Sequence, residues 1–300
     1  MNTGSTPAGA EVTFALECVW DLGAELGEGP VWSARDGGVW FVDIKGCRIH
    51  RFDPGGETRT WQAPSNPGFI FPLVDGGWIV GMKSGLHLFD PESGAFDRFA
   101  AVEPDAPENR LNDGCVDRNG QLWFGSMHDL ETRPTGSLYR LEANGSSRVQ
   151  DSGYVITNGP AFSPDGRTLY HTDTLERLIY ALDIGPDGAL GDRRVFARVE
   201  AGYPDGPAVD AEGCVWTGLF GGWGLDRYAP DGSLIEHVPF PVANVTKPAF
   251  AGEDLRTVYV TTAWKGLSDA EKALQPLAGG LFRFLADTPG LAQAELTLEP

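Results

Sequence analysis

The chain has 300 residues, of which 41% are hydrophobic and 11% aromatic, enough apolar surface for a folded core, which excludes a disordered chain. Its formal charge of −19, from 42 acidic and 23 basic side chains, repels phosphate backbones and anionic lipid, which argues against nucleic acid and membrane partners. The 40 Gly and 22 Pro are spread along the sequence between short apolar stretches, which indicates an all-β chain with many reversals.

The N-terminus and the cysteines bear on domain organisation and location. Residues 1–14 are expected to form a flexible N-terminus, followed by one domain over residues 15–300. The opening segment has no apolar run typical of a secretory signal. The cysteines lie far apart in sequence, and we expect buried free thiols, which suit a reducing compartment and predict a cytoplasmic protein. No obligate protein partner is evident. The four cysteines are Cys18, Cys47, Cys115 and Cys214.

One pattern recurs along the chain: a short apolar strand, an Asp-Gly type of turn, and a second strand rich in aromatic or β-branched residues. This is a hairpin signal. The copies begin about 40 to 47 residues apart, the period of a four-stranded propeller blade. We therefore predict an all-β, six-bladed β-propeller that a short N-terminal strand completes. The copies start, in chain order, at residues 28, 71, 113, 158, 205 and 247, and their third strands are expected at 49–52, 86–89, 137–140, 179–182, 225–228 and 281–284.

One position of the repeat, just before its Gly or Gly-Pro, carries oxygen donors. The innermost strands of a propeller line its channel, so equivalent positions form a ring. Facing carboxylates repel and are costly to bury unpaired, whereas hard divalent cations prefer carboxylate and amide oxygens. A tight turn before the strand is the alternative, but Glu28 is a poor turn former. The pattern predicts a metal site at one end of the channel. The ring residues are Glu28, Phe71 or a neighbour, Asp113, Asn158, Asp205, and Thr246 or Lys247.

Four segments together resemble the regucalcin/gluconolactonase family, in order and spacing, over roughly residues 17–285. They are Leu26-Gly27-Glu28-Gly29-Pro30, Arg110-Leu111-Asn112-Asp113-Gly114, Thr157-Asn158-Gly159-Pro160 and Tyr203-Pro204-Asp205-Gly206. Three further segments are similar to bacterial pentonolactonases that act on xylonolactone or arabinonolactone. These are residues 171–174, 244–248 and 265–269.

The resemblance implies a site in which Glu28, Asn158 and Asp205 hold one divalent metal ion. Arg110 and Asn112 would hold the sugar oxygens, and Asp113 would face substrate. Asp205 would also relay the proton to the ring oxygen. The ion could be iron(II), zinc, manganese, magnesium or calcium. Contacts of substrate with His128, Asp129 and Trp223 are left open.

The expected reaction is hydrolysis of a sugar lactone to the aldonic acid by a carboxylic-ester hydrolase, with a pentonolactone as substrate. Gluconolactone is the alternative substrate. A propeller that binds calcium or a partner without catalysis also stays open, as does another enzyme on the same fold, such as an aryl-esterase or an alkaloid-forming synthase. The polar pair Arg110 and Asn112 favours a polyhydroxy substrate over an aromatic one. The sequence has no Gly-x-Ser-x-Gly elbow to support a serine hydrolase.

Overall fold

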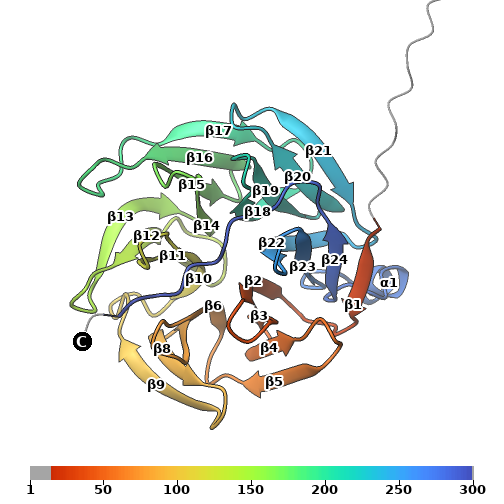
Figure 1. Cartoon of the computed structure of the whole chain (residues 1–300), viewed down its shortest axis with the longest axis horizontal. Helices are drawn as coiled ribbons and strands as arrows, with labels where there is room; N and C mark the ends of the chain where they lie inside the picture. The colour runs from red at the N-terminus through yellow and green to blue at the C-terminus, as the bar shows by residue number, and fades with distance from the viewer. Residues whose placement is uncertain (1–14, 299–300) are drawn as a thin grey trace, which may run out of the picture.

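The computed structural model describes residues 15–298 and confirms a six-bladed β-propeller. Six four-stranded antiparallel sheets surround a central axis (Figure 1). The predicted flexible segment 1–14 lies outside the described residues. Among the described residues, no helix is long and apolar enough to cross a membrane.

Each of the first three blades consists of four consecutive strands, numbered from the channel outward. Blade 1 contains β2 (Gly27–Ser33), β3 (Gly38–Asp43), β4 (Arg48–Phe52) and β5 (Thr58–Gln62). Blade 2 contains β6 (Pro67–Pro72), β7 (Trp78–Met82), β8 (Gly85–Asp90) and β9 (Ala95–Ala100). Blade 3 contains β10 (Asn109–Val116), β11 (Leu122–His128), β12 (Gly136–Leu141) and β13 (Ser147–Tyr154).

The N-terminal strand closes the ring, as predicted. β1 (Glu17–Trp20) pairs with β24 as the outermost strand of blade 6, which makes the first and last strands of the fold neighbours.

Blade 4 contains β14 (Thr157–Phe162), β15 (Thr168–Asp173), β16 (Leu178–Asp183) and β17 (Arg194–Arg198). Blade 5 contains β18 (Tyr203–Val209), β19 (Val215–Phe220), β20 (Gly224–Tyr228) and β21 (Leu234–Pro239). Blade 6 contains β22 (Asn244–Ala251), β23 (Thr257–Ala263), a short helix α1 (Asp269–Leu274) and β24 (Leu281–Leu285).

Blades 1, 3 and 5 share a structural motif that the repeat encodes. A turn carboxylate accepts the indole N–H of a tryptophan on the second strand, at 2.9 to 3.1 Å. An arginine of the third strand lies over the same ring, 5.3 to 5.9 Å from its centroid, which adds a cation–π contact. The motif therefore ties three strands of a blade together at its turn. The three sets are Asp36, Trp40 and Arg51; Asp117, Trp123 and Arg140; and Asp210, Trp216 and Arg227.

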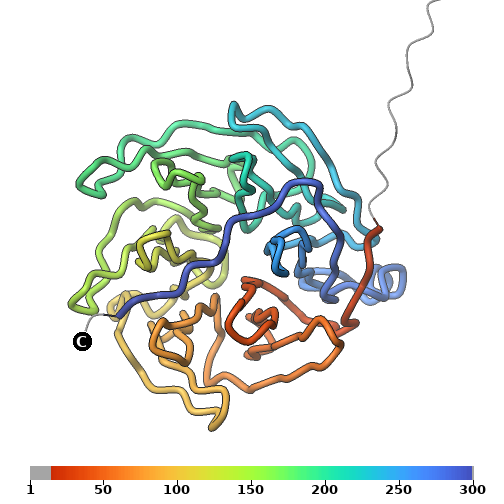
Figure 2. The backbone as a smooth tube through the Cα atoms, in the orientation of Figure 1, coloured from red at the N-terminus to blue at the C-terminus, as the bar shows by residue number. Residues whose placement is uncertain are grey.

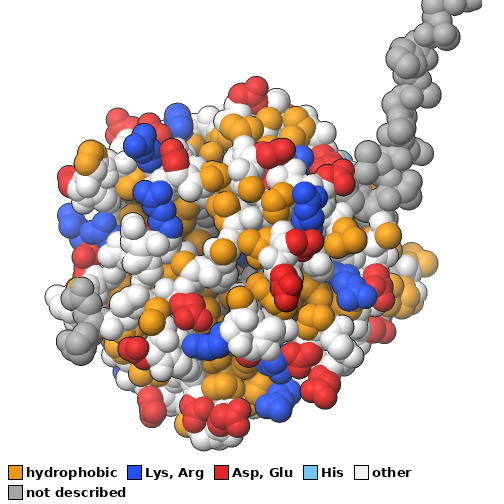
Figure 3. Space-filling view, in the orientation of Figure 1, with side chains coloured by type: hydrophobic (Ala, Val, Ile, Leu, Met, Phe, Trp, Pro, Cys, Tyr) orange, Lys and Arg blue, Asp and Glu red, His pale blue; other side chains and the backbone are white. Residues whose placement is uncertain are grey.

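The C-terminal segment, residues 286–298, crosses one end of the channel (Figure 2). It forms isolated bridges from Gly290 to Asp210 in blade 5 and from Leu296 to Leu73 in blade 2. On this face, hydrophobic side chains show between scattered charged groups (Figure 3). A cavity of about 380 Å³ lies beneath the segment, lined partly by Leu291 and Ala294. This end of the channel is thus covered by the chain itself.

The four cysteines are free, as expected. Cys214 is buried, but the other three are only partly buried, so the prediction of burial holds for one of the four. Cys18, for example, lies on the outermost strand of blade 6, where one side of the strand has no neighbour in its sheet.

Candidate functional site

The inner strands place the predicted metal ligands at the end of the channel away from the C-terminal segment. Glu28, Asn158 and Asp205 lie in the first residues of β2, β14 and β18, where each strand has a β-bulge. A bulge bends the strand and re-aims a side chain. All three side chains are buried.

Sheet register corrects the predicted ring in blade 3. Val31 in blade 1 and Cys115 in blade 3 each pair with the tryptophan of the second strand. Counting back three residues from each reaches Glu28 and Asn112. Asn112 is therefore the ring residue of blade 3, and Asp113 lies one residue deeper in the channel. The sequence prediction was wrong here because it aligned the repeats on their glycines, and the glycine of blade 3 comes one position later.

The sheet register also gives the ring residues of the two weaker repeats, in blades 6 and 2. In blade 6, Ala249 pairs with Tyr259, and the same count reaches Thr246. Lys247 then lies one residue deeper, level with Asp113. In blade 2 the bulge falls between Pro67 and Phe69, so that Gly68, rather than Phe71, stands in the ring.

Asp113 and Lys247 form an ion pair that closes the channel beneath the ring. Lys247 Nζ lies 2.5 Å from Asp113 Oδ1, and both side chains are buried. The other carboxylate oxygen accepts the N–H of Gly159 at 2.7 Å. Burial alone would lower the pKa of Lys247, but the charge of Asp113 holds that pKa above its usual value. The pair joins blades 3 and 6, which lie opposite each other, and forms a floor between the site and the covered end of the channel.

Glu28 and Asp205 are two buried carboxyl groups in contact through a side-chain hydrogen bond. Burial raises the pKa of Glu28, and the charge of Asp113 raises it further. Burial likewise raises the pKa of Asp205, to which the charge of Glu28 adds. Among the ion pairs of residues 15–298, neither carboxyl group has a basic partner, and the charges of Lys247 and Lys265 offset the rise in these pKa values only in part.

A chain of hydrogen bonds orients the amide of Asn158. Arg110 Nη1 donates to Asn112 Oδ1 at 2.5 Å, and Asn112 Nδ2 donates to Asn158 Oδ1 at 2.9 Å. The amide nitrogen of Asn158 donates to Thr174 Oγ1 at 2.9 Å. The Asn158 oxygen therefore retains one lone pair, because a carbonyl oxygen accepts two hydrogen bonds.

These residues fit a hard divalent cation. Two buried carboxyl groups whose pKa values are both raised are relieved by a bound positive charge. Together with an oriented amide oxygen they form the oxygen donor set that such cations prefer. Water and substrate would supply the remaining ligands of an ion held by Glu28, Asn158 and Asp205.

The loop that follows β11, residues 129–135, covers the mouth of the site and is called the roof loop below. Its Asp129 binds Arg110 Nε at 3.2 Å and the ammonium groups of Lys45 and Lys83 at 2.9 Å each. Its Glu131 forms an ion pair with Lys265. These lysines belong to blades 1, 2 and 6, so the loop reaches from blade 3 across the mouth of the channel. Roof and floor are each fixed by an ion pair between blades 3 and 6.

The three residues left open by the sequence have distinct settings. His128 is committed to the roof loop, because Thr132 contacts its Nδ1 and Arg133 its Nε2. Asp129 contacts Arg110 rather than standing free. Trp223 is 47% exposed in the corresponding loop of blade 5, so it is not packed in the blade core.

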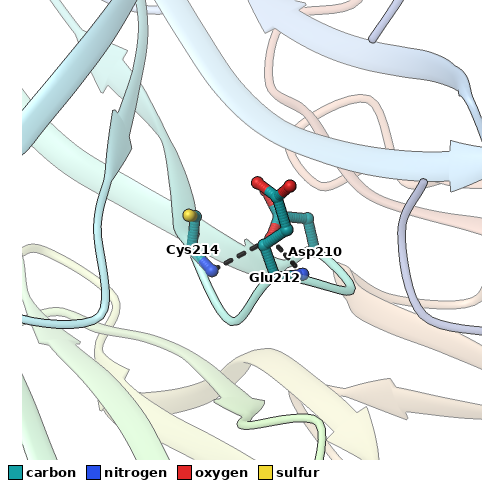
Figure 4. Close-up of side chains that lie close together, drawn as sticks. All are labelled: Asp210, Glu212 and Cys214. Atoms are coloured by element: carbon teal, nitrogen blue, oxygen red, sulfur yellow. Dashed lines mark hydrogen bonds between the residues drawn. The ribbon is translucent and has the colours of Figure 1, made fainter. Parts of the chain in front are cut away.

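A second acidic cluster, at Asp210, Glu212 and Cys214, brings three potential ligand atoms within 4.8 Å of one another (Figure 4). Asp210 Oδ1 accepts the backbone N–H groups of Glu212 and Cys214. Its Oδ2 accepts the indole of Trp216 and the guanidinium of Arg227. The carboxylate is already satisfied and serves the blade motif, so the cluster is not a metal site.

Comparison with known proteins identifies the family. Residues 26–264 match the model of the SMP-30/Gluconolactonase/LRE-like region. The chain belongs to this family. A 6-deoxy-6-sulfogluconolactonase from Pseudomonas putida is 38% identical over 93% of this chain and 97% of the relative. An L-arabinolactonase from Azospirillum brasilense is 37% identical over 98% of both. A calcium-binding regucalcin from Agrobacterium tumefaciens superposes with a TM-score of 0.90 at 29% identity, over 94% of this chain and 97% of that chain.

Membership confirms the resemblance seen in the sequence, and it confirms a hydrolase of the sugar-lactonase class at the level of the family. The structure brings Glu28, Asn158, Asp205, Arg110 and Asn112 to one end of the channel. Their individual roles stay predictions.

The sequence did not reveal the roles of Lys45, Lys83, Lys247 and Lys265. Each lysine reaches its partner across the ring, between blades whose spatial relation the repeat does not specify. One signal was available: the chain has only five lysines, and four of them lie at this site.

Proposed function

We propose that this protein hydrolyses a sugar lactone to the corresponding aldonic acid, using one divalent cation held by Glu28, Asn158 and Asp205. The observation that carries the proposal is the pair of buried carboxyl groups with raised pKa values beside an oriented amide, at the open end of the channel in a member of the lactonase family. The cation, when bound, would polarise the lactone carbonyl and activate water.

We assign the proton transfer of this reaction to Asp205. It can take a proton from the attacking water and pass it to the ring oxygen as the C–O bond of the lactone breaks, which leaves a carboxylic acid and a hydroxyl group. Thr217 Oγ1 contacts the backbone oxygen of Asp205 at 3.2 Å and so helps to fix its strand.

Arg110 is suited to hold substrate oxygens. Its Nε contacts Asp129 and its Nη1 donates to Leu111 O and Asn112 Oδ1. Among the contacts of residues 15–298, Nη2 has no protein acceptor and is left for the sugar or for the oxyanion formed on attack. Asn112 already uses both amide protons, so its clearest task is to orient Asn158, and its contact with substrate stays a prediction.

The substrate we propose is a pentonolactone, such as xylonolactone or arabinonolactone. Segments 171–174 and 265–269 and the relative named L-arabinolactonase support this choice. The relative named 6-deoxy-6-sulfogluconolactonase supports a six-carbon lactone instead. Values of kcat/KM for freshly prepared lactones, corrected for spontaneous hydrolysis, test both the sugar lactone as the substrate class and the preference for five carbons. A preference for gluconolactone would contradict only the choice of a pentonolactone. A preference for aliphatic lactones would contradict the proposal that the substrate is a sugar lactone.

A calcium-binding protein without catalysis is the second candidate, because a regucalcin with the same fold is described as calcium-binding. Metal content and lactone hydrolysis measured on one preparation separate the two. Stoichiometric metal without hydrolysis across an aldonolactone panel would favour this candidate.

A further inference from the structure

Lysines are concentrated at the mouth of the site. Of the five in the chain, Lys45, Lys83 and Lys265 contact the roof loop. Lysines that only maintain solubility would be dispersed over the surface, and in a chain of net charge −19 such a local excess of positive charge needs a reason.

The carboxylates at the mouth do not balance these cations. Asp129 alone is shared by Lys45, Lys83 and Arg110, and Glu131 pairs with Lys265. Among the ion pairs of residues 15–298, Lys45 and Lys83 have no other carboxylate. The charges of Glu131 and Glu28 also act on Arg110, so the unbalanced positive charge is that of Lys45 and Lys83, which share the single charge of Asp129.

Lys83 has unused hydrogen-bonding capacity and space beside it. An ammonium group carries three donors, and one of those on Lys83 is given to Asp129. The side chain is 37% exposed. It lines a cavity of about 220 Å³ together with Arg98 and Arg110. The carboxylate of Glu103, also in this wall, is taken by Ser126, Tyr139 and Asn109.

We propose that Lys83, with Lys45 beside it, forms a subsite for an anionic substituent of the lactone, such as a sulfonate or a carboxylate, carried on the carbon chain away from the lactone carbonyl. The carbonyl end would lie at Glu28 and Asp205, whose two negative charges a bound divalent cation would neutralise. Lys45 and Lys83 at the mouth attract an anion, so they would orient the substrate with its anionic substituent toward the mouth. This inference rests on the proposed lactonase function but not on a neutral pentonolactone as its substrate, because it expects lactones that bear an anion to be better substrates than neutral ones.

The test compares an aldonolactone that bears a terminal sulfonate, the same lactone with a terminal carboxylate, and the parent with a terminal hydroxyl. In the unaltered protein we expect a higher kcat/KM for the anionic lactones than for the parent. This preference should shrink as the salt concentration is raised, because salt screens the attraction between the charges. Lys83→Met should lower kcat/KM for the anionic lactones about ten-fold more than for the parent, the size of one lost hydrogen bond to a charged group. Lys45→Met should act in the same direction. Lys272→Met is the matched control, because Lys272 lies over the ring of Trp264 and, among the ion pairs of residues 15–298, binds neither Asp129 nor Glu131, and it should change none of the three rates.

The outcomes separate the two proposals. Hydrolysis of the parent lactone without a preference for the anionic ones, or an equal loss on all three in Lys83→Met, overturns the subsite and leaves the lactonase function in place. Failure to hydrolyse any of the three overturns both. Should Lys83→Met not fold, the salt dependence of the unaltered protein and the Lys45→Met variant still decide the question.

Discussion

Lys247 and Asp113 occupy equivalent depths in opposite blades, and their ion pair spans the channel. Lys247 Nζ also contacts the backbone oxygen of Gly114 at 3.3 Å, and its side chain passes over Gly206, where an added Cβ would lie 2.6 Å from Lys247 Cδ. The glycine is thus required by the close approach of the lysine. This arrangement fixes the distance between two blades that share no hydrogen-bonded strands.

Lys247→Met should destabilise the fold by about 3 to 5 kcal/mol, because it leaves Asp113 buried without its partner. Urea unfolding measures the loss. The double variant Lys247→Met/Asp113→Asn removes both charges and should recover much of it. If the double variant is as unstable as the sum of the two single variants, the two residues do not act as a pair.

Asp205→Ala should abolish both metal retention and turnover, whereas Arg110→Ala should retain the metal and mainly lower kcat/KM. An arginine carries only donors and cannot be a ligand, but it acts on Asn158 through Asn112. We therefore expect a moderate weakening of metal affinity in Arg110→Ala. Metal analysis after gel filtration, together with lactone kinetics, checks both variants. Loss of the metal from Arg110→Ala as complete as that from Asp205→Ala would refute the assignment.

Local pattern was sufficient to predict the propeller, because each blade is a hairpin repeat whose turns and apolar positions are adjacent in sequence. The depth of a side chain in the channel was less accessible. Glu28 and Asn158 precede their glycines at the ring, but in blade 3 the bulge includes both Asn112 and Asp113, and sequence spacing does not tell which of them stands level with Glu28.

The roof was not predictable for a different reason. Asp129 and Glu131 bind lysines that lie 46 to 134 residues away in sequence, on blades that contact the loop only because the ring closes. Nothing in the sequence near either carboxylate marks its partner.

Glu131→Gln should loosen the roof with little effect on global stability. Its ion pair with Lys265 is partly exposed, so the change in unfolding free energy should stay within about 1 kcal/mol. Hydrogen exchange of residues 129–135 should become faster, since the loop then keeps only the Asp129 contacts. The matched variant Glu142→Gln breaks an ion pair with Arg140 within blade 3 and should leave exchange in the roof loop unchanged. Unchanged exchange in Glu131→Gln would show that the Asp129 contacts suffice to hold the loop.

His171 should make the fold sensitive to acid. It is fully buried on β15, its ring nitrogens have no hydrogen-bond partner among the described residues, and it packs edge-on against Tyr154. Burial lowers its pKa from 6.5 to about 4. Because the folded-state pKa lies below the unfolded one, the stabilising contribution is complete above about pH 6.5 and is lost as the pH falls through 4, a change of about 3 kcal/mol.

The variant His171→Phe isolates the contribution of His171 to the pH dependence of the unfolding free energy. Phe41 and Phe124 stand at the corresponding positions of blades 1 and 3, each next to the aromatic residue that pairs with the inner strand, so the site should accept the ring. The free energy of urea unfolding, measured between pH 8 and pH 4, should fall less steeply in the variant below pH 6.5. His50, whose pKa burial also lowers to about 4, is retained in both proteins and contributes equally to each curve. Parallel curves for the two proteins would mean that His171 is protonated in the folded protein with the help of a polar contact that residues 15–298 do not provide.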